Sequence, residues 1–326
     1  MKVALILIAL CAGLFTLSLV TGFTPVSAQH SLAALLRDDG TPLTVVMREI
    51  RLPRALLAVM IGASLGLAGA AMQGYLRNPL AEPGLIGVSA AAGLGAVLTL
   101  QTGVAAAFAL ALPLGALTSA LLAVGLILAL AGPRGSSLTL ILAGIAVSAL
   151  ASALTSLVLN LSPNPFAAAE IVFWMLGSLA DRSFNHVWIA LPFMALGWVL
   201  LAGLGRGLDA LTLGEDAAAA LGINLNRLRL ALVIGTAASV GAATAVAGAI
   251  GFVGLVVPHV LRRFVGARPS ALLWASALGG AAMVLAADIA VRLLLPDRDL
   301  KLGVLMALVG APLFLHLIYK TRAEFR

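Results

Sequence analysis

The sequence predicts an all-α, polytopic transmembrane helical bundle of about ten helices. Of the 326 residues, 62% are hydrophobic and 10% are charged, and the mean hydropathy is +1.11. A soluble domain has to cover its exterior with polar groups, so it does not tolerate this composition. The apolar runs are continuous rather than alternating, which favours helices over a membrane β-barrel. We therefore expect one transmembrane domain, residues 1–326.

The first and eighth apolar runs are less clear than the rest. Run 3–23 ends near Val26-Ser27-Ala28 and imitates a cleavable signal peptide, but it exceeds the usual apolar core of about 7–15 residues, so we interpret it as a transmembrane helix. Run 253–265 is short, and we expect it to pair with the Gly248–Gly254 segment in a re-entrant arrangement buried by its neighbours. The predicted crossings are 3–23, 53–76, 85–101, 104–131, 139–160, 187–204, 229–250, 253–265, 270–294 and 302–319.

The second crossing is the most informative stretch. It begins after Arg51 and Arg54, continues for about twenty uncharged residues and ends in a polar, proline-broken segment. Gly62, Gly66 and Gly69 mark a face that allows the backbone of another helix to come close. We expect a packed transmembrane helix here.

The same stretch carries a resemblance to a known family. R-L-P-R at 51–54, N-P-L-A-E-P-G at 78–84 and G-V-S at 87–89 resemble the FecCD-type permease subunits of ABC importers for iron-siderophore, haem or cobalamin. The similarity continues almost to the C-terminus. It implies a type II permease fold and a homodimer with a pathway along its two-fold axis. It also implies two ATP-binding subunits, a periplasmic or lipid-anchored substrate-binding protein and a metal-chelate substrate. ATP and Mg would be bound by the partner subunits, and this chain would bind no cofactor.

Three arginines are candidates for docking the binding protein. Arg51, Arg54 and Arg292 fall at the outer ends of predicted helices, where arginine side chains also serve as interfacial anchors. Guanidinium groups suit bidentate carboxylates, and the resemblance implies that these positions receive acidic residues of the binding protein. Asp288 lies one turn before Arg292, and we expect the two to form a structural ion pair rather than a proton relay.

The longest polar stretch on the predicted cytoplasmic side is 205–228, for which we predict cytoplasmic coupling helices. Its residues favour a short, glycine-terminated helix, a turn, and a second short helix that begins near Asn224. An alanine-rich loop is often only a connector. The resemblance instead implies that it fits a cleft on the ATPase, with Asp216 in place of the family's Glu. The predicted coupling residues are Gly214, Glu215, Asp216, Ala217, Ala218, Leu221 and Gly222.

Neutral polar residues at or within crossings are candidates for a transport path. Many such residues only hydrogen-bond neighbouring helices. The resemblance places the 132–140 loop near the cytoplasmic gate. The predicted gate and pathway residues are Gln73, Asn78, Ser136 and Ser137, and Ser89, Thr155 and Asn160 are further candidates.

The basic charge of the chain points to membrane lipid rather than nucleic acid. The net charge is +7 and the pI is about 10.7, but the basic residues lie between apolar runs, where they orient the protein and contact headgroups. With both termini in the cytoplasm, twelve of the 20 Lys and Arg residues fall inside. We expect a multi-pass protein of the bacterial inner (plasma) membrane.

Two rival functions remain open at this point. An ion-coupled secondary transporter of a small organic solute requires titratable acids inside the membrane, and only Asp288 qualifies. A membrane hydrolase would rest on the G-x-S-x-G match around Ser64, which lies within an apolar run. The three lysines do not follow glycine, so a Walker A loop is impossible here, and if ATP drives this protein another chain must bind it. The four scattered histidines support no metal site.

Overall fold

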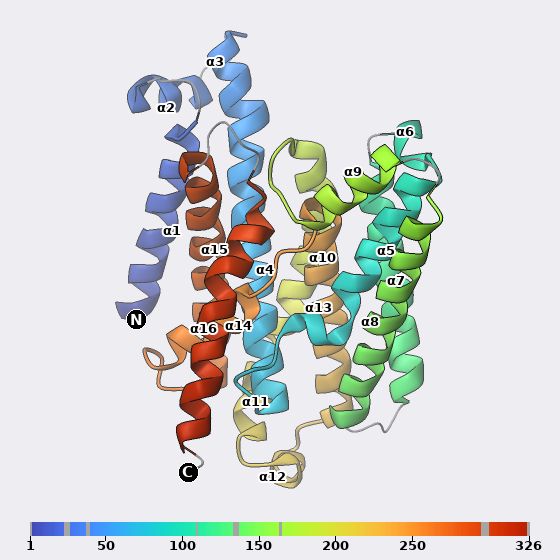
Figure 1. Cartoon of the computed structure of the whole chain (residues 1–326). Coiled ribbons are helices and arrows are strands. Elements are labelled where there is room, and N and C mark those ends of the chain that lie inside the picture. Colours follow the sequence, from blue (N-terminus) through green and yellow to red (C-terminus); the bar gives the residue numbers. More distant parts are fainter. Residues whose placement is uncertain are drawn as a thin grey trace.

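The computed structural model describes residues 2–22, 27–36, 40–108, 110–132, 137–162, 165–294 and 300–324. Within these ranges every regular element is a helix and no strand occurs. The long helices stand side by side, with α2 (Ala28–Leu36) and α3 (Pro42–Val45) at one end and α12 (Glu215–Ala220) at the other (Figure 1). We refer to these as the α2–α3 end and the α12 end.

Each predicted crossing has a helix near its predicted place, which confirms the all-helical membrane fold. Seven helices in the described part of the chain are long and apolar enough to span a membrane, and three apolar helices are shorter. The helices are α1 (Lys2–Val20), α4 (Leu52–Leu76), α5 (Val88–Gln101), α7 (Ala111–Ala131), α8 (Ser137–Asn160), α10 (Phe184–Ala202), α13 (Leu225–Ala247), α14 (Val253–Arg262), α15 (Pro269–Leu294) and α16 (Leu302–Glu324). The connecting elements are η1 (Val46–Arg51), η2 (Pro83–Ile86), α6 (Val104–Ala107), α9 (Pro165–Met175) and α11 (Gly205–Leu211).

The single helix predicted over 104–131 is wrong. The chain instead forms α6, leaves helical geometry at Phe108, whose φ is −160° and ψ 148°, and resumes as α7 at Ala111. Pro113 explains the break. A proline has no N–H and its ring clashes with the carbonyl four residues earlier, so it is accommodated in a first turn but not in the middle of a helix.

Two short helices, α5 and α14, are each preceded by an irregular segment, and these segments contact each other. Phe252, which precedes α14 with a left-handed φ of 67°, donates its backbone N–H to the Glu82 carboxylate at 2.9 Å. The predicted burial of the eighth run, 253–265, is confirmed for residues 253–258, which are all buried, but not for Val260 and Phe264, which are exposed. Irregular backbone at membrane depth requires such cover by protein.

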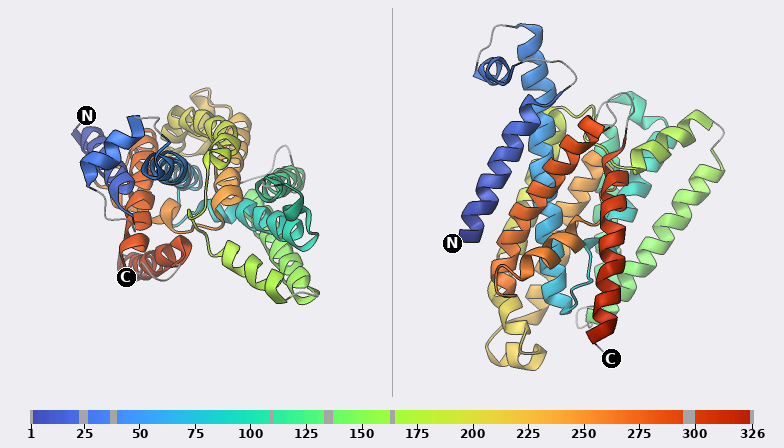
Figure 2. Two further views of the ribbon diagram at one scale, coloured as in Figure 1. Left: turned by 90° about the horizontal axis from the view of Figure 1, so that it is seen from above. Right: turned by 60° about the vertical axis from the view of Figure 1, so that its left-hand side comes forward.

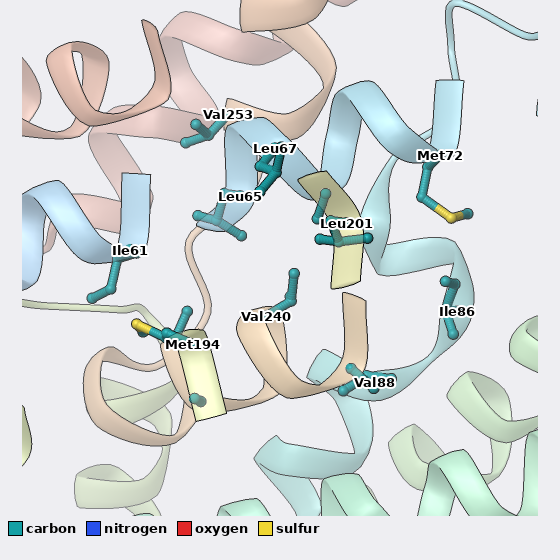
Figure 3. Close-up of a cluster of buried hydrophobic side chains, with 14 of the residues drawn as sticks. Ile61, Leu65, Leu67, Met72, Ile86, Val88, Met194, Leu201, Val240 and Val253 are labelled. Atoms are coloured by element: carbon teal, nitrogen blue, oxygen red, sulfur yellow. The ribbon is translucent and has the colours of Figure 1, made fainter. Parts of the chain in front are cut away.

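Helices α4 and α13 form the centre of the bundle. In each of these two helices, 83% of the residues in an apolar stretch of 18 residues are buried. In the other long helices the corresponding share is 17–39%. Figure 3 shows Leu65 of α4, Met194 of α10, Val240 of α13 and Val253 of α14 in one apolar cluster. Figure 2, seen from above, places α1 and α16 at one edge of the bundle and α7 and α8 at the opposite edge.

The predicted close-packing face of α4 is confirmed. A Cβ added at Gly62 would overlap the backbone of Gly280, and one added at Gly66 would overlap the carbonyl of Ser276, both in α15. A Cβ at Gly69 would overlap the backbone of Gly254. Backbone atoms cannot turn aside as a side chain can, so α4 and α15 depend on these glycines for their contact.

Gly66→Ala is therefore expected to lower the thermal unfolding temperature in detergent by several degrees, because overpacking costs about 1–3 kcal/mol. Gly125, within α7, serves as the matched control, because a Cβ added there would have no atom within 4 Å. Gly125→Ala should leave the temperature unchanged or raise it, since alanine favours helices. Equal shifts in the two variants would contradict this account of the α4–α15 contact.

Candidate functional site

The three arginines predicted for docking lie at the α2–α3 end, where α1, α4 and α15 meet. Arg51 directs its Nη1 to the backbone carbonyls of Leu19 at 3.0 Å and Val20 at 3.3 Å. These carbonyls belong to the end of α1, where helical carbonyls lack partners and a positive charge is favoured. Arg51 thus closes the end of α1 and is 6% exposed.

The local backbone that presents Arg51 is a π-helix. In η1, the N–H of Leu52 bonds to the carbonyl of Met47, five residues earlier. Pro53 follows at once and has no N–H, and its ring requires room in the preceding turn. A wider turn provides that room, which accounts for π geometry at this point.

Arg292 secures the same end of α1 from the α15 side. Its Nη1 donates to the carbonyls of Ser18 at 2.9 Å and Thr21 at 2.8 Å, and its Nη2 donates to the Ser18 hydroxyl at 2.7 Å. Two guanidinium groups therefore hold the last turn of α1 against α4 and α15.

Asp288 joins the two arginines that flank it. One carboxylate oxygen accepts from Arg54 at 2.8 Å, and the other lies 2.8 Å from Nη2 of Arg292. The predicted ion pair with Arg292 is confirmed. The bond to Arg54 was missed, because the two residues are 234 positions apart and no local pattern connects them. A carboxylate that is 1% exposed needs such partners, and here it has two.

The docking role of these arginines stays a prediction. The side chain of Arg54 is 17% exposed and that of Arg292 is 7% exposed. All three arginines are bound within the chain, and Arg54 is the most exposed of them, so it has the most access to a partner.

At the α12 end, α12 forms a small projecting knob with a defined stop. Gly222 has a left-handed φ of 83°, and its N–H bonds to the carbonyl of Ala219 at 2.9 Å. The N–H of Ile223 reaches back to the carbonyl of Ala218 at 3.0 Å. These two bonds make a Schellman motif, so the predicted glycine-terminated helix is confirmed.

The second short helix predicted near Asn224 is wrong in one respect. Asn224 does cap a helix, since its side chain accepts from the N–H of Arg227 at 3.0 Å. However, this helix is the long α13, which continues without a break to Ala247. The stretch after Asn224 contains neither proline nor glycine for ten residues, so nothing stops the helix.

The predicted coupling residues fall into two groups. Glu215 and Asp216 are exposed in the first turn of α12, whereas Ala218 is fully buried beneath it. Leu221 is 64% exposed, and Leu213, which the sequence reasoning missed, is 69% exposed just before α12. These two leucines are apolar side chains that α12 and the residues around it leave exposed. The coupling role itself stays a prediction.

Asp209 of α11 fastens the base of the knob to α15. Its carboxylate accepts from the N–H of Ser270 at 2.9 Å, from the Ser270 hydroxyl at 2.7 Å and from Arg268 at 2.9 Å. Burial acts to raise the pKa of this carboxyl, but the Ser270 and Arg268 bonds together hold the pKa below its usual value. A lowered pKa means that the link is intact at neutral pH and is lost only as the pH falls below the ordinary carboxyl range.

Gln73, predicted to lie on the path, is a buried link between α4 and α14. Its amide nitrogen donates to the carbonyls of Gly254 and Leu255, both at 3.3 Å, and its oxygen accepts from Arg262 at 3.1 Å. Asn78 shapes the turn after α4, where its side chain accepts from the N–H of Leu80 at 2.9 Å. Their pathway roles stay predictions.

The remaining pathway candidates are only partly visible. Ser136 lies outside the described residues, and of Ser137 only its place at the start of α8 is described. Ser89 and Thr155 come together in a cavity of about 300 Å³ between α5, α8, α9 and α13, which Thr244 also lines. This lining is neutral and weakly polar.

Ser64 does not lie on a strand-to-helix turn, and the described residues bring no metal-binding group together. Ser64 is fully buried in the middle of α4, where its hydroxyl accepts from the indole N–H of Trp198 at 2.8 Å. Across the described ranges, no group of three or more His, Cys, Asp or Glu side chains is placed to hold a metal ion.

Comparison with known proteins gives a consistent result. The model of the FecCD transport family matches residues 7–320. The chain is 37% identical to the Fe(3+) dicitrate transport system permease protein FecD of Escherichia coli, over 99% of this chain and 100% of that protein. It is 39% identical to the vitamin B12 import system permease protein BtuC of Klebsiella pneumoniae, over 85% and 83%. A solved inward-facing metal-chelate type ABC transporter superposes with a TM-score of 0.87 at 33% identity, covering 98% of this chain and 99% of that one.

The single cysteine gives a direct test of the Asp288 cluster. Cys11 of α1 is half-buried and its thiol donates to the carbonyl of Leu278 in α15 at 3.1 Å. Asp288→Asn leaves two buried guanidinium groups without their carboxylate, a change that costs about 3–5 kcal/mol in buried pairs. The end of α1 should loosen, and thiol-reactive dye should label Cys11 several-fold faster.

Asp181→Asn is the control, because Asp181 is exposed in the loop before α10. Its labelling rate should equal that of the unmodified protein. If Asp288→Asn also left the labelling rate unchanged, the cluster would not hold α1 in place.

Proposed function

Because the chain belongs to the FecCD transport family, we propose that it carries a metal chelate such as a ferric siderophore, haem or cobalamin across the membrane. The chain is the transmembrane permease subunit of a binding-protein-dependent ABC importer. The relatives named above transport iron dicitrate and vitamin B12, which are bulky chelates. The neutral lining of the Ser89–Thr155 cavity is suited to hold such a cargo weakly while the binding protein supplies the affinity.

The importer needs partners, since ABC permeases act with ATPase and substrate-binding subunits. We assign the pathway to the axis of a homodimer with a second copy of this chain, with two ATP-binding subunits on its cytoplasmic face. ATP and Mg are bound by those subunits, and this chain contributes alternate opening rather than chemistry. The absence of a glycine-lysine pair from the sequence supports this division of labour.

We place the α12 end in the cytoplasm and the α2–α3 end outside. In this orientation the first residues of α1 and the last residues of α16 both point toward the α12 end (Figure 1). The N-terminus and the C-terminus therefore lie on the cytoplasmic side. The excess of Lys and Arg on that side supports the orientation.

The observation that carries the proposal is the continuity of α15 between the two polar ends. At its first turn, Ser270 is bound by Asp209 beneath the α12 knob. At its last turns, Asp288 and Arg292 hold the end of α1 and Arg54. A helix is a stiff rod over this length, so movement of the knob reaches the outer end through α15. The binding protein docks at that outer end, with Arg54 as the first contact.

Leu221→Asn should abolish co-purification of the ATPase while leaving the unfolding temperature unchanged, because Leu221 is exposed and supports no packing in this chain. Leu36→Asn, at an 89% exposed leucine of the α2–α3 end, is the matched control and should retain the ATPase. Equal recovery of the ATPase with both variants would remove the knob from the coupling interface.

The cargo class is tested with the complete importer. Proteoliposomes that contain the permease and its ATPase and binding-protein partners should hydrolyse ATP several-fold faster with one of ferric siderophore, haem or cobalamin. Chelate-free ligands serve as controls. No response to any of the three chelates would discard the cargo class, although the ABC importer assignment would stand.

A further inference from the structure

A basic cavity of about 550 Å³ lies between the lower part of α14 and α16. His259, Arg262, Arg263 and His316 contribute to its wall. Among the described residues that line it, none is acidic. The cavity wall therefore carries the positive charge of two arginines, which favours an anionic group.

The N–H donors of Arg262 and Arg263 are only partly used by hydrogen bonds within the described part of the chain. Arg262 uses Nη2 for Gln73, but its Nε–H is buried and bonds to no acceptor among the described residues. Arg263 is exposed, with its guanidinium 4.7 Å from the ring centre of Phe264. Because that Nε–H is enclosed by protein, an anion in the cavity would be held by the charge of the two guanidinium groups that line its wall.

A purely apolar groove of about 420 Å³ adjoins this cavity. Val256 and Val260 of α14 line both spaces. The groove continues along α1, where Leu10 is 48% exposed, and along α15, where Ala286 is exposed. All of its described lining residues are apolar. Helices α1, α14, α15 and α16 occupy the edge of the bundle away from α7 and α8, as Figures 1 and 2 show.

We propose that this continuous site binds one anionic phospholipid, with its phosphate at Arg262 and Arg263 and an acyl chain in the groove beside α1. Basic pockets between transmembrane helices recognise lipid phosphates in this way. The apolar extension distinguishes a lipid from free phosphate, which has no use for it. We assign this lipid to the cytoplasmic leaflet, an assignment that rests on the orientation of the permease proposed above.

The lipid has a structural task in this position. Helix α1 is the least buried of the long helices, since only 17% of the residues in its apolar stretch of 18 residues are buried. Its contacts to the bundle are with α15 and the end of α4, and the groove separates its lower half from α14. An acyl chain fills that groove and joins α1 to α14, as a side chain would in a larger core.

Native mass spectrometry of the full chain in mild detergent, titrated with phosphatidylglycerol, phosphatidylcholine or inorganic phosphate, tests the proposal. Phosphatidylglycerol should bind at least tenfold more tightly than phosphatidylcholine. The double variant Arg262→Gln, Arg263→Gln should weaken phosphatidylglycerol binding about thirtyfold, since each basic contact to an anionic lipid contributes about fivefold. Arg206→Gln, at an exposed arginine of α11, is the charge control and should bind normally.

The groove has its own pair of variants. Ala286→Phe fills it from an exposed position and should weaken phosphatidylglycerol binding about tenfold, since a buried acyl chain gains affinity with every methylene. Ala129→Phe, at an exposed position of α7, should have no effect. Arg263→Gln alone leaves the Gln73 bond intact, so a several-fold loss with this variant excludes misfolding as the cause.

Three results would overturn the proposal. These are equal binding of the two lipids, unchanged binding by the double variant, and occupancy by inorganic phosphate that Ala286→Phe does not alter. The last result would identify a soluble anion as the ligand. None of these readouts uses transport, so failure here leaves the permease assignment untouched, and Leu221→Asn should bind the lipid normally.

Discussion

The contact between α4 and α15 is the constraint on which the rest of the structure depends. Gly62 and Gly66 allow the two backbones to touch, and that distance fixes where the charged ends of both helices fall. Only with α4 this close can Arg54 reach Asp288 across 234 positions of sequence. In a membrane, where burial of apolar surface gives helices little reason to associate, such close packing supplies much of the attraction.

The polar residues of this chain act mostly on other parts of the same chain. Asp288 forms ion pairs with two arginines, Arg51 closes the end of α1, and Gln73 joins α4 to α14. The Asp288 carboxylate is 1% exposed and lies within ion-pair distance of both guanidinium groups, so its role is to hold helix ends together. This arrangement disfavours an ion-coupled secondary transporter and is consistent with a permease whose energy comes from a separate ATPase.

Prediction from the sequence was reliable where the deciding interactions join residues that are close together in the chain. Apolar length located ten helices, the spacing of Asp288 and Arg292 predicted their ion pair, and Gly222 predicted the end of α12. It failed where the deciding contact is distant or where a proline was given too little weight. Pro113 divides one predicted helix, and Asp209 meets Ser270 across 61 positions. Exposure of Leu213 could not be read from sequence either, since leucine is common in every segment.

The central claim is that α15 transmits movement from the α12 knob to the outer end, and Asp209 is its most accessible link. The most direct test is the number of cargo molecules moved per ATP hydrolysed by the reconstituted importer carrying Asp209→Ala. We predict that the ATPase still binds and hydrolyses ATP, while the transport ratio falls severalfold. A ratio equal to that of the unmodified importer would contradict the claim.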